Sequence, residues 1–464
     1  KFGSSCTFWS MGRAALLVWI LVPAASSSDG ELRRRTCLTQ AHYEPSMRRN
    51  VSVDGIRQPL KIGVPDWDSS HLVGAIFRII TEEILGINTV PVTCLSTVAC
   101  IYALIGCKSP DAYITDARCG SPWQPHFHIV FEMWMHDQAR AHLELVQQHY
   151  PERYPALLGN LGYVAYESSF GTGGSLAQAV TQEHLPLDFY FSYSHPRINP
   201  ARFFGSPWDV SNDRLYLCNQ TELAFDSTMR EYVAITGDSE GVVIMNGTND
   251  TRYMAACPDG YRWLSPACRA DHSRCIPFLT GGNGWHVGVM MQKAAMLQIP
   301  LAVAVAHSWG DYVELPKEHL MLMYWWFPDR TFLSQRPFRI VYPEHSPEDW
   351  ERGYYATDDP RTDLQKAAAN GLMENRLNAG LEQALGLARR LTLSSKDMTA
   401  LMMNSQNRSD TEAVVCEWLN GKGSLEEWFP SATDCVQGQG LVSEQGFHVS
   451  TRAEAGSCQW CSIG

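Results

Sequence analysis

The sequence lacks the features that mark several common classes of protein. Its basic residues form no run longer than Arg33–Arg35, and the formal charge of the 464-residue chain is -12. A chain with neither a basic stripe nor a positive balance is not expected to bind nucleic acid or an anionic membrane. Repeats of roughly 20 to 50 residues are also missing, which excludes solenoids and propellers. The acidic balance is compatible with a small cationic partner.

The sequence also lacks an apolar run long enough to cross a bilayer. The longest candidate, "AALLVWILV", covers Ala14–Val22, follows the basic Arg13 and precedes Pro23 and the small residues "AASSS". A spanning helix needs about 20 apolar residues. The pattern instead predicts a leader with a secretory signal peptide in residues 1–28, followed by an N-terminal extension in residues 29–57.

Motifs of catalysis and nucleotide binding are missing as well. There is no G-x-S-x-G elbow and no cysteine-protease signature, and "FGTGGS" at Phe170–Ser175 has neither the lysine nor the glycine spacing of a phosphate loop. His126, His128 and His136 are grouped, but no further ligand completes a zinc-site spacing. We therefore expect a non-enzymatic protein without cofactor or metal.

Cysteines and glycosylation sequons are plentiful. Thirteen of the 14 cysteines follow residue 28, which is typical of a secreted protein or a luminal domain with disulfides. The candidate disulfide residues are Cys257, Cys268, Cys275, Cys416 and Cys435, whose pairing the spacing leaves open. The sequons, which predict glycosylation on an exported chain, are at Asn50, Asn219, Asn246, Asn249 and Asn407.

Strand and helix patterns alternate along much of the chain. "LKIGVP" at 60–65 is typical of a buried strand, and residues 69–85 have apolar side chains at helical spacing. A helix at 95–104 and a strand at 128–134 continue the pattern, which predicts an α/β fold with a mainly parallel sheet. The pattern stops between about 185 and 275, and a helical end follows, with one helix at 363–391 and others beginning near Ser395 and Asp410.

Large aromatic residues recur where a predicted strand meets a loop. They are Trp67, Trp134, Tyr261, Trp263, Trp325 and Trp326. Because ligands bind beyond the carboxyl ends of strands in open α/β sheets, Trp67, Trp134 and Trp326 could meet there. The alternative is that each ring only fills a core. If 320–327 is a strand, Trp325 and Trp326 point to opposite faces, so one should be structural and the other functional.

Several of these segments together resemble one known family. They are "LKIGVPDWDSSHLVGAIFRIITEEILG", "CPDGYRW", "YWWFPDRTF", "LGLARRL", "TLSSKDMTALMM" and "CEWLNGKGSLEEWF". Over about Leu60 to Phe429 the chain resembles the substrate-binding proteins of glycine betaine/choline ABC importers. The resemblance implies a two-lobed type II periplasmic-binding-protein fold with the ligand cleft between the lobes.

The resemblance also implies a domain plan. Lobe I would comprise residues 58–145 and 335–436, and lobe II would comprise residues 146–334 with a Cys-rich, glycosylated insertion at about 185–275. Residues 437–464 are rich in Gly, Ser and Gln and end in "CQWCSIG"; this composition, rather than the resemblance, predicts a linker and the start of a possible Cys-rich repeat.

Family members hold quaternary ammonium groups in an aromatic cage. Matching motifs implies that Trp134 is the first cage residue, Tyr261 or Trp263 the second and Trp326 the third, with Trp67 close by. Asp68 and Ser69, at the start of the predicted helix, could bind a carboxylate through their backbone N–H groups. The chain departs from the family at His136, which follows the first of these motifs, and at Asp329 and Arg330, which follow the third; all three belong to the expected site.

We therefore expect a secreted or luminal protein that binds glycine betaine, choline or a relative, as the substrate-binding component of a transport system with a membrane transporter as partner. The alternative is the ligand-sensing ectodomain of a membrane receptor, with a C-terminal receptor region beyond residue 464.

Overall fold

The computed structural model describes most of the chain between Thr36 and Phe429. The described residues are 36–39, 41–53, 55–94, 96–107, 124–135, 137–246, 251–281, 285–335, 337–345, 367–374, 381–405 and 410–429. They belong to one compact unit. Among the helices formed by these residues, none is both long enough and apolar enough to cross a membrane.

A large mixed sheet organises the described chain. Its strands are β3 Leu60–Pro65, β4 Thr89–Cys94, β5 Ile129–Trp134, β6 Ala156–Gly171, β9 Arg262–Leu264, β10 Ile276–Thr280, β11 Leu301–Val305, β12 Leu322–Phe327, β13 Phe338–Arg339 and β14 Ala367–Met373. The strand order is β4-β3-β5-β14-β6-β12-β10-β11-β9, and β13 pairs with β6. Two hairpins lie outside this sheet: β1 Val51–Val53 with β2 Ile56–Gln58, and β7 Val242–Asn246 with β8 Thr251–Ala255.

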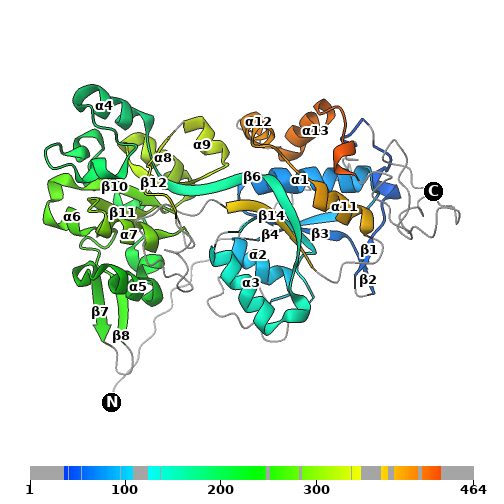
Figure 1. The fold of residues 1–464 in the computed structure, drawn as a ribbon, viewed down its shortest axis with the longest axis horizontal. Helices are drawn as coiled ribbons and strands as arrows, with labels where there is room; N and C mark the ends of the chain where they lie inside the picture. Colours follow the sequence, from blue (N-terminus) through cyan, green and yellow to red (C-terminus); the bar gives the residue numbers. More distant parts are fainter. Residues whose placement is uncertain are drawn as a thin grey trace, which may run out of the picture. The chain divides into compact units, whose positions relative to one another are not determined.

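Helices surround this sheet (Figure 1). They are α1 Asp68–Glu83, α2 Thr97–Leu104, α3 Asp137–His149, α4 Gly173–Glu183, α5 Asp226–Thr236, α6 Pro266–Ala270, α7 Val287–Met296, α8 Trp309–His319, α9 Arg330–Gln335, α11 Glu382–Arg390, α12 Ser395–Ser405 and α13 Thr411–Gly421. The α/β class predicted from the sequence is confirmed. The expectation of a mainly parallel sheet is wrong, because β14 pairs antiparallel with β5 and β6, and β6 pairs antiparallel with β12.

The long strand β6 is shared by two groups of strands. From Ala156 to Ala165 it pairs with β14, and from Tyr166 to Gly171 it pairs with β12. Figure 1 shows it running from the elements around β14 to those around β12. The partner therefore changes between Ala165 and Tyr166, at the middle of the ten-stranded sheet.

The buried apolar side chains fall into two regions. We call the first core the clusters built by β3, β5 and β14 with α1, α2, α3, α11, α12 and α13. The second core is built by β10, β11 and β12 with α5, α7 and α8 and with the segments before α5. Fully buried side chains in the second core include Trp263 and Trp325, and Trp428 is fully buried in the first.

The helix expected at 363–391 is wrong in its first part. Residues Ala367–Met373, with the sequence "AAANGLM", form β14, and helix α11 begins only at Glu382. Alanine favours a helix locally by a few tenths of a kcal/mol per residue over most other residues. Pairing with strands on both sides outweighs that preference, and small side chains suit a central position where Ala369 is fully buried.

Local signals at the helical end were more reliable. Helix α12 begins at Ser395, and Ser394 donates its hydroxyl to Asp397 Oδ2 (2.6 Å) while accepting the Asp397 N–H (3.1 Å). Helix α13 begins after Asp410, whose side chain accepts the Ala413 N–H at 3.1 Å. Both starts agree with the sequence, because each cap is satisfied within one turn.

Four disulfides join described cysteines. They are Cys37–Cys416, Cys94–Cys100, Cys218–Cys257 and Cys268–Cys275. The first ties the segment before β1 to α13, across 379 residues of sequence. The candidate Cys435 lies outside the described residues.

The predicted sequons that are described lie at the surface or in the β7 hairpin. Asn50 and Asn219 are exposed, and Asn246 is the last residue of β7. Asn249 and Asn407 lie outside the described residues. Glycosylation at these positions stays a prediction.

Candidate functional site

Two tryptophans meet at the ends of neighbouring strands in the first core. Trp67 follows β3 and precedes α1, and Trp134 ends β5. Because β3 and β5 are parallel, their carboxyl ends lie at the same edge of the sheet. The two ring centroids are 5.5 Å apart at an angle of 54°. Trp134 is buried, while Trp67 is half-buried.

A buried carboxylate supports this pair. Glu132 Oε1 accepts the indole N–H of Trp134 (3.3 Å) and the hydroxyl of Ser69. The backbone of Glu132 has a left-handed φ of 57° inside β5, which is uncommon for a residue other than glycine. Burial raises the pKa of Glu132 to about 7, and the hydrogen bonds from Ser69 and Trp134 oppose that rise. Sequence reasoning did not identify this residue.

A second group of aromatic rings ends the strands of the other core. Trp326 lies near the end of β12, is half-buried, and contacts Trp285 edge-on at 4.9 Å. Trp285 follows β10 and Trp309 follows β11, and both strands run parallel within the group that contains β12. Trp309 is 50% exposed, and its ring centroid lies 6.2 Å from that of Trp326.

Trp285 and Trp309 were missed by sequence analysis. The signal that identified Trp67 and Trp134, an aromatic residue where a strand meets a loop, is also present in "GGNGWH" and "AHSWGD", a few residues after β10 and β11. The same rule, applied to every strand rather than to selected motifs, predicts them.

The two groups of rings meet at Ala165. Trp134 and Ala165 form one small buried cluster, and Trp67 and Trp326 both pack against it. We call these four residues the tryptophan junction. Ala165 is the residue of β6 next to the change of partner from β14 to β12. The structure thus brings together three site residues expected from the sequence that lie up to 259 positions apart, Trp67, Trp134 and Trp326.

Charged groups connect the two sides of the junction. Asp68, the first residue of α1, pairs with Arg330, the first residue of α9, at 3.0 Å from Oδ2 to Nε. Asp329 is buried, and its Oδ1 accepts the Trp325 indole N–H (3.1 Å) and the Phe332 N–H (2.8 Å). Burial, and then the nearby Asp68 charge, raise the pKa of Asp329 to about 6, against the effect of these hydrogen bonds.

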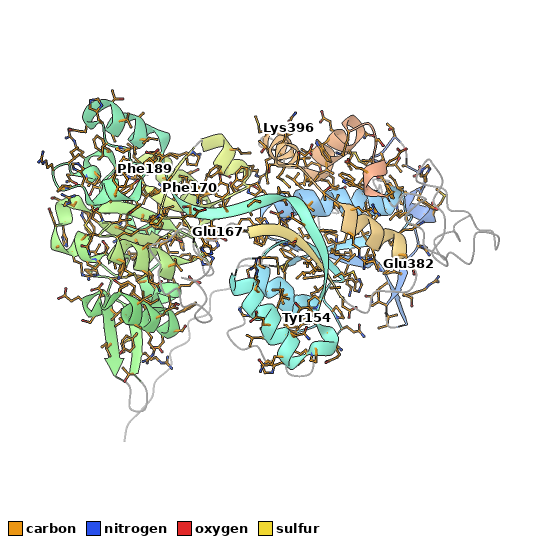
Figure 2. The ribbon with its side chains drawn as sticks, viewed as in Figure 1. Tyr154, Glu167, Phe170, Phe189, Glu382 and Lys396 are labelled. Carbon is orange, nitrogen blue, oxygen red and sulfur yellow. A yellow bond between two sulfur atoms is a disulfide. The ribbon has the colours of Figure 1, made fainter. Side chains whose placement is uncertain are left out.

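A further acidic group lies behind Trp326. Glu167, labelled on β6 in Figure 2, is opposite Trp326 in the strand register. Its Oε2 accepts the hydroxyl of Tyr324 and lies 3.2 Å from Nε2 of His286. Three largely buried carboxyl groups therefore lie close to the aromatic rings around the junction: Glu132, Glu167 and Asp329.

Other expected site residues are not brought to the junction. Trp263 is fully buried in the second core, donates its N–H to the Gly241 carbonyl (2.9 Å) and meets Tyr232 edge-on at 5.5 Å. Tyr261 is half-buried against the cluster that contains Trp325. His136 lies outside the described residues. We therefore leave Trp263 out of the proposed site, because its position is that of a core side chain.

The two adjacent tryptophans differ in burial but do not point apart. Trp325 is 1% exposed and stacks on Tyr312 at 4.8 Å and 14°, whereas Trp326 is half-buried. The centroids of the Trp325 and Trp326 rings are only 5.7 Å apart, and the two ring planes are nearly parallel, at an angle of 20°. The expectation that strand alternation separates the rings is therefore wrong, although one ring is buried in the core and the other reaches the junction.

Comparison with known proteins gave distant structural similarities only. No family model matches the chain, and no curated protein matches its sequence. Lactococcal OpuAC, in a closed conformation with glycine betaine, is similar over 80% of this chain and 100% of its own, with 12% identity and a TM-score of 0.40. An ABC-transporter choline-binding protein in complex with choline is similar over 79% and 91%, with 11% identity and a TM-score of 0.43. The glycine betaine/L-proline-binding protein ProX from Borrelia burgdorferi is similar over 80% and 97%, with 9% identity and a TM-score of 0.41.

Proposed function

We propose that the protein binds a small quaternary ammonium or related onium compound, such as choline or glycine betaine, at the tryptophan junction. In this proposal it acts outside the cytoplasm as the substrate-binding component of a transport system with a membrane transporter as partner. The observation that supports it most is the convergence of Trp67 and Trp134 from the first core with Trp326 from the second.

The chemistry of the junction suits such a ligand. A quaternary ammonium has no N–H group to donate, so it is held by aromatic faces and by negative charge. Each desolvated ring contributes up to about 2 kcal/mol, so three rings contribute about 6 kcal/mol. Micromolar binding requires about 8 kcal/mol, and the remainder would come from the nearby carboxylates and from other contacts to the ligand. Glu132, Glu167 and Asp329 are buried carboxyl groups that attract a cation when they are ionised.

A polar end of the ligand also has a partner available. The indole N–H of Trp326 is buried and makes no hydrogen bond to a described residue. A buried donor without an acceptor costs about 1 to 3 kcal/mol, which a ligand hydroxyl or carboxylate oxygen would recover. In the present conformation the Trp67 and Trp134 rings contact each other and Trp326 packs against the Trp134–Ala165 cluster, so the ligand would enter by separating Trp326 from the Trp67–Trp134 pair.

Calorimetric titration tests the proposal. Choline, glycine betaine, proline betaine and dimethylsulfoniopropionate are titrated into the folded protein, and at least one should bind with a dissociation constant well below about 1 mM. Trp326→Ala should weaken that binding at least about tenfold, since it removes one ring face. Trp208→Ala is the matched control, because Trp208 is 44% exposed and lies in the short helix η5, Pro207–Asp209. Failure of all four compounds to bind a folded protein would refute the function.

A further inference from the structure

Burying the Glu132 carboxyl group at this position costs folding free energy. Its side chain is completely buried, and only one of its two carboxyl oxygens has hydrogen-bond donors. Oε2 has no hydrogen-bond partner among the described residues. Burying an acid without satisfying it is costly, and here the backbone is held in a left-handed conformation as well. Packing alone does not require either feature, since an apolar side chain would fill the same space.

Two unused donors face this carboxyl group. The Tyr163 hydroxyl and the Trp67 indole N–H are both buried and without a hydrogen-bond partner. Both favour the ionised form of Glu132, although neither makes a hydrogen bond of good geometry to it in this conformation. The donors for a fully ionised carboxylate are thus already in place, and one of them belongs to a ring of the junction.

The hydrogen bond from the Trp134 indole to Glu132 lets the ionised carboxylate strengthen the attraction between the Trp134 ring and a cation. An indole whose N–H donates to a carboxylate has a more electron-rich face, and attraction of a cation to a ring depends on that face. The buried setting also weakens the screening of the carboxylate by water. A neutral molecule of the same shape would gain from neither effect.

We propose that Glu132 determines the charge selectivity of the tryptophan junction, so that its ionised carboxylate favours a cation over a neutral isostere and cation binding is coupled to release of one proton. This inference rests on the proposed function. In the coupled step the O–H bond of the neutral Glu132 carboxyl breaks, the proton passes to solvent buffer, and the carboxylate remains opposite the bound cation.

We assign the coupling to Glu132 because the other two acids around the junction contact different residues: Asp329, whose pKa burial raises to about 6, accepts hydrogen bonds from Trp325 and Phe332, and Glu167 accepts one from Tyr324. Tyr163 on β6 is the titratable residue that interacts with it directly, and burial together with the Glu132 charge raises the Tyr163 pKa well above its usual value. On α1 the charged residue next to Ser69 is Asp68, which pairs with Arg330. Strand β14 contains no titratable residue, and Lys61 on β3 precedes the residues paired with the start of β5.

The sign of the pH dependence follows from the coupling. Burial holds the pKa of Glu132 at about 7 in the free protein, and a bound cation lowers it. Affinity for a cation therefore rises with pH up to about this value and then levels off, by at most about tenfold per pH unit.

The test compares two ligands of one shape. Choline carries a permanent charge, and 3,3-dimethylbutan-1-ol replaces its nitrogen with carbon and is neutral; neither titrates between pH 5.5 and 8.5. Choline affinity should be about tenfold weaker at pH 5.5 than at pH 8.5, whereas affinity for the alcohol should not fall with acidity. Calorimetry in two buffers of different ionisation enthalpy should show proton release on choline binding at pH 6.5, which needs no variant.

Two variants separate Glu132 from other buried acids. Glu132→Gln should remove most of the pH dependence and lower the preference for choline over the alcohol about tenfold at pH 8.5. Glu231→Gln is the matched control, because burial also raises the pKa of Glu231 on α5 to about 7 while α5 packs against α7 and the β7–β8 hairpin. It should leave both quantities unchanged.

The outcomes distinguish the two proposals. Choline binding that is independent of pH and releases no proton overturns the role of Glu132 and leaves the proposed function standing. A pH dependence as large in Glu132→Gln as in the wild type also overturns it. Absence of choline, betaine and alcohol binding at every pH overturns the proposed function and this inference together.

Discussion

Truncating each of the two adjacent tryptophans should give opposite results. Trp325 is 1% exposed, stacks on Tyr312 and donates its N–H to Asp329. Trp325→Ala should lower the free energy of unfolding by about 3 to 5 kcal/mol, the usual cost of removing a buried aromatic side chain. The loss should lie toward the upper end, because the buried Asp329 carboxyl also loses one of its two donors.

Trp326→Ala should instead act on ligand binding. Trp326 is half-buried, its N–H has no partner among the described residues, and its ring packs against the Trp134–Ala165 cluster. We expect a loss of about 1 to 2 kcal/mol in stability, within the ordinary range for point substitutions. Choline binding should weaken at least about tenfold, or 1.4 kcal/mol. Trp326→Phe should recover part of that loss, because the aromatic face is retained.

Urea unfolding measures the free energy of unfolding of each variant, and calorimetric titration measures its affinity for choline, on the same preparations. The wild type and Trp208→Ala provide the reference values. If Trp325→Ala abolished choline binding in a protein as stable as the wild type while Trp326→Ala unfolded the chain, the roles would be reversed. If neither substitution changed affinity, the junction would not be the binding site.

Three further outcomes are expected. Burial raises the pKa of Glu132 from 4.5 to about 7 on folding. The stability that the neutral carboxyl group contributes is therefore complete below pH 4.5 and is lost as the pH rises through 7. Urea unfolding should show that Glu132→Gln is about 3 kcal/mol more stable than the wild type at pH 8 and equally stable at pH 4. Replacing Cys37 and Cys416 by serine removes a disulfide that closes 379 residues, and should cost about 2 to 5 kcal/mol; a change below 0.5 kcal/mol in urea unfolding would contradict this. Entry of choline at the junction, with closure of the two cores around it, should change the radius of gyration measured by X-ray scattering and raise the melting temperature with ligand concentration, and constancy of both would contradict ligand-linked motion.

Local sequence patterns predicted the elements whose signals are short in range. Strand β3 has the bounds expected from "LKIGVP", α1 follows the apolar periodicity of its segment, and α12 and α13 begin directly after their capping residues. Each of these depends on contacts within a few residues, such as the Asp410 side chain and the Ala413 N–H. The residues that make such interactions are close together in the sequence, so a local pattern is enough to predict them.

Features decided by pairing between distant segments were not predictable in the same way. Ala367–Met373 has the composition of a helix and becomes a strand because β5 and β6 lie on either side of it. The partner of Cys416 is Cys37, which no spacing rule indicates. Local preferences of a few tenths of a kcal/mol per residue are easily exceeded by the pairing and burial of a whole strand.

The candidate site shows the same division. The sequence by itself determined that aromatic residues follow several strands, and this was enough to select Trp67, Trp134 and Trp326. Only the tertiary structure decided that Trp263 is a core residue, that the rings of Trp285 and Trp309 lie beside Trp326, and that Glu132 is buried beneath the first pair. A side chain's type is fixed by its own position in the chain, whereas its burial and its neighbours depend on which distant strands pair around it.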